Sequence, residues 1–408
     1  MSQHARRQLT VVLAGAASLA IAMGVGRFAF TPILPMMLHD GVLDLHVAGN
    51  LATANYIGYL VGALASMLVP KKWDHTTVIR LALATTVILT ALMALPIPSM
   101  WISLRFLAGV VSAVGFVFTS GWCLAELAGT SGSIGSAIYT GPGAGIALSG
   151  VAASFMSAAG LTGQLGWVAF AAMSAIMSAL IWGVFGRRTK SVEPFYVGTA
   201  RAASGKVPGA EMPLFAVAYG LAGFGYIITA TYLPVIAKNA IPDSPLLTVF
   251  WPLFGISAVV GSLLAAKVKK SADARLYLIG SYLLQAAGVA LSVVWQDALG
   301  LAASSMLVGI PFTAISFFAV NEVRRIRSTH HARHMGLLTA MFAIGQIMGP
   351  PAVGVILRNE ANVDVGFALA LGIASLTLVV GAAIFVAMIV VFPAERRPAG
   401  TAKHVSGY

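Results

Sequence analysis

The stretch MGVGRFAFTPILP at residues 23–35 returns in related form as AGFGYIITATYLP at residues 222–234. Two glycines and a proline stand at matching places in both stretches, and at the same offset Gly62 matches Gly261. Gly145 and Gly345 continue the relation, one residue further on. An internal repeat of this kind predicts a duplicated architecture. The chain is therefore interpreted as two parallel halves.

The composition indicates that both halves lie in lipid. Of 408 residues, 58% are hydrophobic and 9% are charged, and the mean hydropathy is +0.89. Soluble domains carry about 25% charged residues. With so few charges, an aqueous surface would expose large apolar patches. A water-soluble enzyme, a disordered chain and a nucleic-acid-binding domain are therefore excluded.

Twelve apolar runs are long enough to cross a bilayer, which takes about 20 residues. They are predicted at 9–37, 47–69, 77–95, 100–126, 133–158, 164–185, 212–237, 246–266, 275–295, 299–322, 334–357 and 365–392. We expect an all-α membrane protein with twelve transmembrane helices in two pseudo-symmetric six-helix bundles. The predicted divisions are an N-terminal bundle at 1–185, a cytoplasmic linker at 186–211, a C-terminal bundle at 212–394 and a cytoplasmic tail at 395–408.

The basic residues predict how the chain is oriented. With the N-terminus in the cytoplasm, every Lys and Arg lies in a cytoplasmic segment except Arg27, Arg105, Lys238 and Arg358. This asymmetry follows the positive-inside rule. The formal net charge of +12 therefore reflects membrane orientation, not a nucleic-acid partner. Both termini are predicted to be cytoplasmic, and we expect a monomer.

Three local motifs carry a resemblance to a known family. Gly26 followed by Pro32-Ile33-Leu34-Pro35 is similar to the motif that ends span 1 of twelve-span drug and metabolite antiporters. Arg105-Phe106-Leu107-Ala108-Gly109 resembles a span-4 Arg-x-x-Gln-Gly motif, with Ala108 in place of Gln. Gly345-Gln346-Ile347-Met348-Gly349-Pro350 resembles the Gly-Pro motif of span 5 or 11. Together they resemble the major facilitator superfamily of secondary transporters.

Four longer stretches narrow the resemblance. GVGRFAFTPILPMM, YTGPGAGIALSG, GFGYIITATYLPVIA and GQIMGP look like the bacterial YbfB/YjiJ group of that superfamily. The resemblance implies a multi-pass transporter of the bacterial cytoplasmic (inner) membrane. One loop departs from the superfamily pattern, because the Asp, Arg, Gly and Arg usual between spans 2 and 3 are replaced by Ser66, Met67, Val69 and Pro70.

Two arginines lie inside predicted spans, whereas all 13 acids lie at span ends or in loops. A charge at membrane depth is costly and marks a functional candidate. Without a nearby carboxylate, Arg27 and Arg105 could hold an anion from solution, because a guanidinium binds a carboxylate through two parallel hydrogen bonds. In a second interpretation, Arg27 bonds backbone carbonyls near Gly24 and Gly26 while Arg105 braces span 1. A third gives them a role in coupling only.

Helical spacing selects further candidates for a substrate cavity. Residues three, four or seven apart share one face of a helix. This criterion groups Asn55 with Tyr59, Tyr219 with Tyr226, and Thr339 with Phe342 and Gln346. Tyr139 and Trp251 are single aromatic candidates on spans 5 and 8. For each aromatic residue, ordinary packing or interfacial anchoring is the alternative interpretation.

Two further sets of residues are predicted to serve conformational change. Glycines and prolines allow bending and close helix approach across the bundle interface; the candidates are Gly24, Gly26, Pro32, Pro35, Gly145, Gly345, Gly349 and Pro350. The acids nearest the cytoplasmic mouth are Glu126 and Glu322. They are expected to close that side by salt bridges with Arg324, Arg325 or Arg333, with proton carriage as the alternative.

The sequence thus predicts a secondary active transporter that moves a small organic anion by alternating access with proton coupling. A proton-driven exporter of drug-like or hydrophobic metabolites and a transporter-like sensor without net flux are the alternatives. The expected partners are a small-molecule substrate, protons and membrane lipid, with no nucleic acid. No cofactor is predicted, because no Gly-x4-Gly-Lys-Ser/Thr loop occurs. No metal site is predicted either, since arginines flank His330, His331 and His334.

Overall fold

The computed structural model describes residues 3–68, 73–127, 137–186, 210–241, 244, 247, 249–268, 273–326 and 331–393. Across these residues the chain is built from helices, and no strand occurs among them. Almost all of the predicted linker at 186–211 and the whole predicted tail at 395–408 lie outside the described residues.

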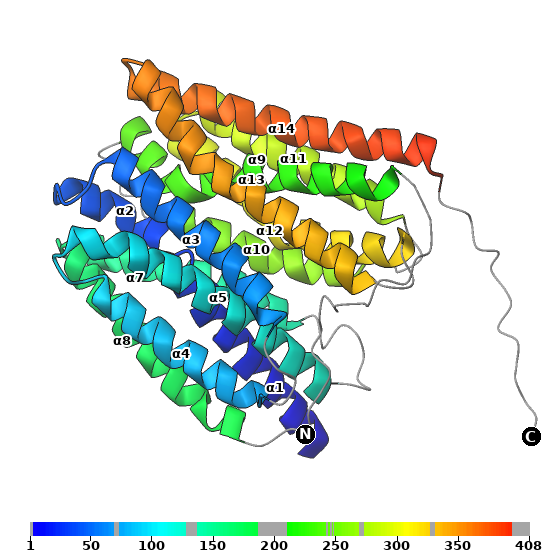
Figure 1. Cartoon of the computed structure of the whole chain (residues 1–408). Coiled ribbons are helices and arrows are strands. Elements are labelled where there is room, and N and C mark those ends of the chain that lie inside the picture. Colours follow the sequence, from blue (N-terminus) through cyan, green and yellow to red (C-terminus); the bar gives the residue numbers. More distant parts are fainter. Residues whose placement is uncertain are drawn as a thin grey trace, which may run out of the picture.

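The helices form two groups that follow each other along the chain (Figure 1). The first contains α1 (Gln3–Leu19), η1 (Ala20–Val25), α2 (Phe30–His39), α3 (Leu45–Ser66), α4 (His75–Leu92), α5 (Pro98–Glu126), η2 (Ala137–Thr140), α7 (Gly141–Ala158), α8 (Gly163–Trp182) and η3 (Val184–Gly186). The second contains α9 (Glu211–Ala240), α10 (Phe250–Ala266), α11 (Ala274–Val294), α12 (Ala298–Ile326), α13 (His331–Asn359) and α14 (Val363–Val391). We call these groups the N-half and the C-half.

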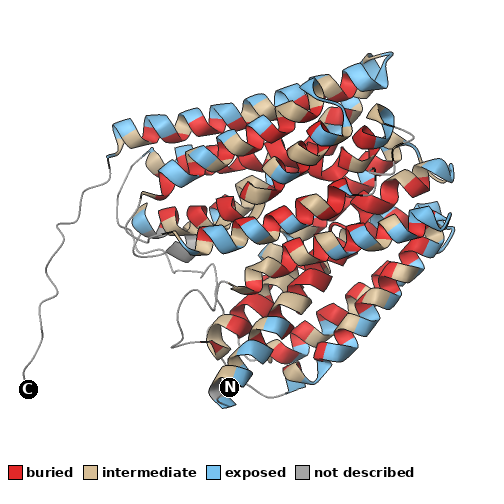
Figure 2. Cartoon of the chain, turned by 180° about the vertical axis from the view of Figure 1, so that it is seen from behind, coloured by how far each residue is buried: buried red, intermediate tan, exposed pale blue. Residues whose placement is uncertain are grey.

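The twelve-helix fold is confirmed. Among the described residues, nine helices are long and apolar enough to cross a membrane, taking α1, η1 and α2 together as one. The apolar helix α10 is slightly shorter, and α3 and α7 complete the twelve. Buried residues run along the helices where the two halves meet, and exposed residues lie on the outer faces, which lipid would cover (Figure 2).

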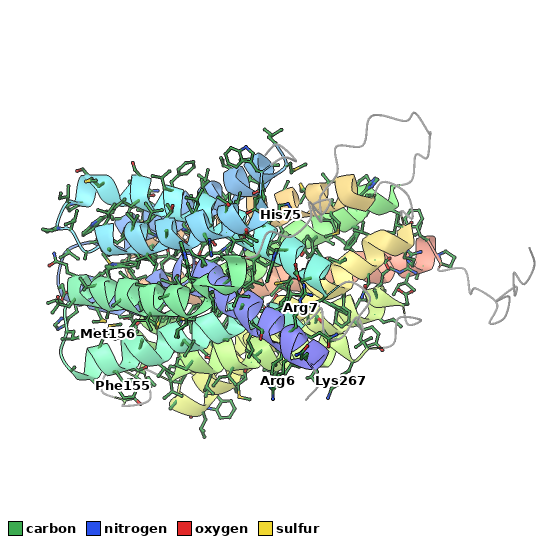
Figure 3. The ribbon with its side chains drawn as sticks, turned by 90° about the horizontal axis from the view of Figure 1, so that it is seen from below. Arg6, Arg7, His75, Phe155, Met156 and Lys267 are labelled. Carbon is green, nitrogen blue, oxygen red and sulfur yellow. The ribbon has the colours of Figure 1, made fainter. Side chains whose placement is uncertain are left out.

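The two ends of the bundle differ in charge. Arg6, Arg7 and Lys267 lie together at one end, and Phe155 and Met156 lie at the other (Figure 3). We call these the basic end and the opposite end. At the opposite end, Gly41 and Gly160 have φ values of 67° in the turns after α2 and α7. Such a left-handed conformation favours glycine.

Short polar side chains set the starts of several helices. Asp44, Asp74, Thr162 and Asp273 each accept a backbone N–H bond from the first turn of the helix that follows. Asn362 does the same for α14. These bonds satisfy backbone donors that have no partner within the helix. The span starts predicted from the sequence therefore agree with capped helix starts to within a few residues.

Glycines bring helices into backbone contact at equivalent places in the two halves. A Cβ atom on Gly62 would lie 2.3 Å from the Val110 carbonyl oxygen in the α3/α5 crossing. A Cβ atom on Gly261 would lie 1.8 Å from the Ile310 carbonyl oxygen in the α10/α12 crossing. The repeat seen in the sequence thus has a physical cause, because each member of the pair allows the same close helix crossing.

The structure corrects the assignment of Gly145 and Gly345 to the interface between halves. A Cβ on Gly145 would meet the Ala20 carbonyl oxygen at 2.4 Å, and one on Gly345 would meet the Gly220 carbonyl oxygen at 2.1 Å. Both contacts lie within one half. Contacts across the interface involve neighbouring glycines, since a Cβ on Gly143 would lie 2.8 Å from the Gly255 carbonyl oxygen. Gly349 likewise packs on Ile227 within the C-half.

The first span is broken where the sequence predicts flexibility, but its prolines do not break it. A π-helical turn occupies Ala20–Val25, with a bond from the Gly26 N–H to the Ile21 carbonyl oxygen of 3.0 Å. A non-helical turn at 26–29 then precedes α2. Pro32 lies in the first turn of α2, where proline is tolerated, and Pro35 lies inside that helix. Such π-bulges are typical of functional sites in helices.

Candidate functional site at the centre of the two halves

Arg27 lies directly after the π-helical turn and is buried at the meeting of the two halves. Its side chain is 3% exposed. One terminal nitrogen, Nη2, donates a hydrogen bond of 2.5 Å to Oε1 of Gln346 on α13. The guanidinium carbon lies 3.9 Å from the ring centroid of Tyr59 and 5.4 Å from that of Tyr56, both on α3. Its Nε has no hydrogen-bond partner among the described residues.

Gln346 connects Arg27 to a second predicted residue. Its Nε2 donates to the Tyr226 hydroxyl on α9. The orientation of the amide follows from chemistry, since a guanidinium can only donate and must therefore face the amide oxygen. Arg27, Gln346 and Tyr226 thus form a chain of hydrogen bonds from the N-half to the C-half. All three side chains are buried.

The break in the first span leaves two backbone carbonyls without helical partners, and two predicted residues satisfy them. Asn55 Nδ2 donates to the Gly26 carbonyl oxygen at 3.3 Å and to the Arg105 carbonyl oxygen at 3.0 Å. Arg105 Nη2 donates to the Arg27 carbonyl oxygen at 3.0 Å, and its guanidinium lies over the Phe30 ring. For Arg105 this geometry agrees with the second interpretation, in which it braces span 1, and for Asn55 it corrects the predicted role in lining a substrate cavity. Their polar groups hold the backbone that carries Arg27.

Aromatic rings pack around the hydrogen-bonded chain. Tyr226 and Phe342 are stacked, with centroids 5.6 Å apart, and Phe342 also contacts Tyr219 at 4.8 Å. Phe312 lies 5.3 Å from Tyr226 and 5.7 Å from Phe28. We call seven of these connected rings the central aromatic group; its members are Phe28, Tyr219, Tyr226, Trp251, Phe254, Phe312 and Phe342.

Exposure increases from Arg27 toward the basic end. Tyr56, Tyr226 and Gln346 are buried, whereas Tyr59 and Phe342 lie one turn nearer that end and are half-buried. Toward the opposite end, the Thr31 hydroxyl donates to the Ala230 carbonyl oxygen at 2.8 Å across the interface. The hydroxyls of Tyr56 and Thr231 also meet there at 2.8 Å. The halves are therefore joined on the opposite-end side of Arg27, and nearer the basic end they are also joined by a bond from Ser262 to the Tyr139 carbonyl oxygen.

Four residues of this site were missed by the helical-spacing argument: Phe28, Tyr56, Phe254 and Phe312. For other residues of the site, the internal repeat gives a signal in the sequence, because it relates positions in one half to positions in the other. Thr31 and Ala230 are 199 residues apart and touch, and the same offset relates Arg27 to Tyr226. Equivalent positions in a parallel duplication face each other across the pseudo-two-fold axis. The repeat could therefore have paired these residues in advance.

The remaining predicted cavity residues take different places. Trp251 is buried beside Phe254, with parallel rings 5.1 Å apart, and so belongs to the central aromatic group. Tyr139 lies in η2 near the basic end, where its ring contacts Phe116 at 6.1 Å and its carbonyl oxygen accepts from Ser262 of the C-half at 3.3 Å. The structure places Tyr139 at the interface between halves and not in the central aromatic group.

Glu126 and Glu322, the predicted gating acids, are bound within their own halves. Glu126 forms an ion pair of 2.7 Å with Arg7 of the N-half. Glu322 accepts bonds of 3.0 Å and 2.7 Å from Arg325 of the C-half. The expected salt bridge between Glu322 and Arg325 is therefore present, within the C-half, and the pair recorded for Glu126 is with Arg7 instead of the predicted arginines. The side chains of Arg324 and Arg333 lie outside the described residues.

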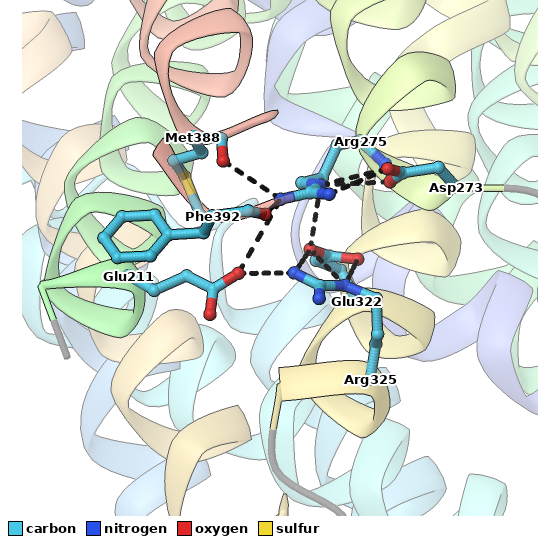
Figure 4. A network of polar contacts seen from close by, with 7 residues as sticks. All are labelled: Glu211, Asp273, Arg275, Glu322, Arg325, Met388 and Phe392. Carbon is cyan, nitrogen blue, oxygen red and sulfur yellow. Dashed lines mark hydrogen bonds and ion pairs between the residues drawn. The ribbon is translucent and has the colours of Figure 1, made fainter. Parts of the chain in front are cut away.

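Arg275, which the sequence analysis counts among the basic residues of the cytoplasmic segments, is the centre of a polar network at the basic end (Figure 4). Its side chain is 0% exposed and is paired with Asp273 at 2.8 Å and with Glu322 at 3.5 Å. Its Nη1 donates to the carbonyl oxygens of Met388 and Phe392 at the end of α14. We call this the Arg275 network; its members are Glu211, Asp273, Arg275, Glu322, Arg325, Met388 and Phe392.

The ionic groups of this network outside the spans have shifted pKa values. Burial acts to raise the pKa of Asp273, but hydrogen bonds and charge from Arg275 and the charge of Arg325 outweigh it and hold the pKa below its ordinary value. Burial acts to lower the pKa of Arg325, and its bonds to Glu322 and Glu211 outweigh that effect and raise it. Asp273 and Arg325 are therefore held in their charged forms at neutral pH.

The fold and the buried central site define a major facilitator transporter, that is, a multi-pass membrane carrier. More narrowly, the chain belongs to the family described as "Uncharacterised MFS-type transporter YbfB", whose model matches residues 19–386. The crystal structure of a mutant of the nucleoside transporter NupG is similar, with a TM-score of 0.70 and 16% sequence identity. That match covers 94% of this chain and 99% of the other, and at this identity it shows the fold alone. None of the curated proteins matches the chain.

Proposed function

We propose that this secondary transporter carries a small organic anion across the bacterial cytoplasmic membrane by alternating access, with proton coupling. The observation that supports the proposal is that Arg27 is buried and its hydrogen bonding is incomplete. It lies 3% exposed at membrane depth, its Nε has no partner, and its recorded hydrogen bond goes to a neutral amide. Among the described residues, no carboxylate forms an ion pair with it.

The energetics favour a negatively charged ligand at this place. A charged side chain inside a membrane costs several kcal/mol unless it is paired or faces water. Cation–π contact with the faces of Tyr59 and Tyr56 offsets a part of that cost. A carboxylate would offset more of it, because it offers two oxygens to the guanidinium fork. The central aromatic group would then contact the apolar body of the anion.

The direction of access follows from the exposure of the surrounding side chains. Half-buried Tyr59 and Phe342 lie between Arg27 and the basic end, while cross-half bonds join the opposite-end side. We propose that the basic end faces the cytoplasm, as the positive-inside rule requires, and that both termini are cytoplasmic. In this arrangement the anion reaches Arg27 from the cytoplasmic side.

Proton coupling is assigned to the substrate. Glu126 and Glu322 are paired with arginines at the basic end, and the ion pairs recorded for the described residues include none at Arg27. An organic acid can carry its own proton if it binds Arg27 as the anion, takes up one proton at the site from the side on which it entered, crosses as the neutral acid, and releases the proton into solution on the other side. Flux should therefore follow the pH gradient even when Glu126 or Glu322 is replaced by Gln.

The test is substrate flux into proteoliposomes that contain purified protein. Arg27→Gln should abolish the flux of an anionic substrate, and Arg27→Lys should reduce it at least tenfold, because a lysine cannot form the bidentate bond. Reconstituted amounts are matched by quantifying protein in the vesicles. Full transport by both variants would refute the proposal.

A second candidate is export of drug-like or hydrophobic metabolites. The observation that favours it is the central aromatic group, which offers ring faces to an uncharged planar compound. This function predicts that cells expressing the protein tolerate toxic hydrophobic compounds better and that Arg27→Gln retains the tolerance. Loss of tolerance in Arg27→Gln would favour the anion carrier instead.

A further inference from the structure

We infer that Gln346 is an internal substitute for the anion, so that its amide oxygen occupies the Arg27 site until a substrate displaces it. This inference rests on the proposed function and adds a competitor to it. In the described structure the Gln346 oxygen lies 2.5 Å from Arg27 Nη2, where a carboxylate oxygen of a bound anion would lie. Both side chains are buried, so the contact excludes water.

The incomplete bonding of Arg27 supports displacement. Gln346 supplies one oxygen to a group with five N–H donors, and Arg27 Nε is buried without a partner. A buried donor without a partner is destabilising. A carboxylate, which has two oxygens and a full negative charge, can satisfy more of these donors than the amide. The exchange therefore replaces a weak neutral partner by a stronger ionic one.

The Tyr226 hydroxyl can keep its hydrogen bond to the Gln346 amide after an anion displaces that amide from Arg27. Gln346 Nε2 already donates to the Tyr226 hydroxyl. The amide can therefore leave Arg27 while α13 stays bonded to α9 within the C-half. Displacement breaks the hydrogen bond from Arg27 in the N-half to Gln346 in the C-half. Binding of the anion would thus loosen one contact that joins the halves at their centre.

Competition by Gln346 has a measurable consequence. An anion that must first displace the amide binds with an apparent affinity lowered by the fraction of protein in which the site is free. Removing the amide should raise the affinity, and replacing it by a carboxylate should abolish it, because Arg27 would then have a permanent ionic partner. If Gln346 merely lined the cavity, removal of its amide would lower the anion affinity or leave it unchanged.

The experiment is a thermal-shift titration of the purified full-length protein with sodium benzoate, sodium acetate and sodium sulfate, and with benzamide as the uncharged match to benzoate. A ligand that binds the folded state raises its apparent stability according to its affinity. We expect at least one anion to stabilise the wild type. Gln346→Ala should bind it at least threefold more tightly, and Gln346→Glu at least tenfold more weakly.

Gln285→Leu is the matched control. Gln285 is a buried glutamine on α11 whose amide donates to the Val308 carbonyl oxygen, away from Arg27. This variant should bind the anion as the wild type does, although its stability falls. Sodium chloride at equal ionic strength corrects for general salt effects.

The outcomes separate the two proposals. If Arg27→Gln loses binding while Gln346→Ala and Gln346→Glu bind as the wild type does, the internal-substitute inference is wrong and the anion carrier stands. If no anion stabilises the wild type or Gln346→Ala, both are wrong. If benzamide binds as tightly as benzoate and Gln346→Glu retains both, the uncharged-substrate candidate is favoured and this inference fails.

Discussion

Arg27 is positioned by backbone carbonyls that a broken helix leaves free. The π-helical turn at Ala20–Val25 and the turn after it interrupt the hydrogen-bond ladder. In lipid such groups must find partners within the protein, and Asn55 and Arg105 provide them. The local backbone therefore explains why Asn55 and Arg105 are buried beside Arg27. Arg27 remains the residue that would bind a ligand.

Asn55→Leu tests this positioning role. The substitution conserves volume and removes the donor shared by the Gly26 and Arg105 carbonyls. The Arg105 carbonyl lies inside α5 and keeps its place in the helical ladder, so the orphaned Gly26 carbonyl should account for a loss of about 1–3 kcal/mol of unfolding free energy. The apparent stability can be followed by chemical unfolding in detergent. Asn239→Ala is the control, because Asn239 is an exposed amide and should change stability by less than about 0.5 kcal/mol. Equal stabilities of the two variants would contradict the role.

Part of this site could be predicted from the sequence because a charge buried at membrane depth is energetically costly. A buried arginine is rare enough to be recognised without a structure, and helical spacing found Tyr59, Tyr226 and Gln346. Spacing did not separate Arg105 from Arg27, because both lie in spans and the difference depends on which one meets a free carbonyl. Nor did it find Phe312, which is one of 20 phenylalanines and has no sequence mark of its own.

At the scale of the helices, glycines fix the crossings within each half. The duplicated pair Gly62 and Gly261 faces backbone carbonyls in equivalent crossings. The sequence identified these glycines by their repeat, but assigned the spacing at Gly145 and Gly345 to the wrong interface. A glycine indicates close approach without indicating which neighbour approaches, so the partner needed the structure.

Gly261→Ala and Gly280→Ala form a matched pair in neighbouring helices. The new Cβ at position 261 would lie 1.8 Å from the Ile310 carbonyl oxygen, whereas a Cβ at position 280 would meet nothing within 4 Å. Gly261→Ala should lower the unfolding free energy by about 1–3 kcal/mol through overpacking. Gly280→Ala should be neutral or slightly stabilising. The midpoints of thermal unfolding decide, and equal midpoints would refute the crossing.

The Arg275 network joins the starts of α9 and α11 to the ends of α12 and α14. Arg275 is 0% exposed, and removing one partner of a buried pair costs about 3–5 kcal/mol. The N-half is built differently at the offset positions, because Thr76 replaces Arg275 and Asp74 binds only threonines and helix-start N–H groups in the bonds recorded. The network ties the C-half into a unit.

Acid should weaken the Arg275 network in a defined range. Because Asp273 has a pKa below its ordinary 3.8 in the folded protein, its contribution is complete above about pH 4 and is lost as the pH falls through the lowered value. Asp273→Asn should therefore be less stable than the wild type by about 1–3 kcal/mol at pH 7. The difference should shrink as the pH falls below about 4 and vanish only below the lowered pKa of Asp273. A difference independent of pH would show that Asp273 is not held as a carboxylate by this network.

At the scale of the whole molecule, the two halves meet along a pseudo-two-fold axis. Thr31 of the N-half bonds Ala230 at the equivalent position of the C-half. The twelve spans, the fold and the repeat followed from composition and periodicity, because lipid imposes long apolar helices. Apart from pairs that the repeat relates, such as Thr31 and Ala230, the contacts between halves did not follow, since they depend on the conformational state that the molecule adopts.

A cross-link at the opposite end tests alternating access. In a Cys123→Ser background, which removes the single native cysteine, Thr31→Cys and Ala230→Cys are joined by a short bis-methanethiosulfonate reagent, which attaches to each cysteine through a disulfide bond. Cross-linking should reduce substrate flux in proteoliposomes at least tenfold, because that end must open. A reductant that cleaves the link should restore flux, and each single cysteine should be insensitive. Undiminished flux after complete cross-linking would contradict the mechanism.

The most direct measurement of the central claim is an experimental structure of the protein with 4-bromobenzoate, with the bromine located by its anomalous signal. We predict the carboxylate at the guanidinium of Arg27, the bromine among the central aromatic group, and the amide of Gln346 turned away from Arg27 and still bonded to Tyr226. A carboxylate bound elsewhere, with Gln346 still on Arg27, would contradict the account.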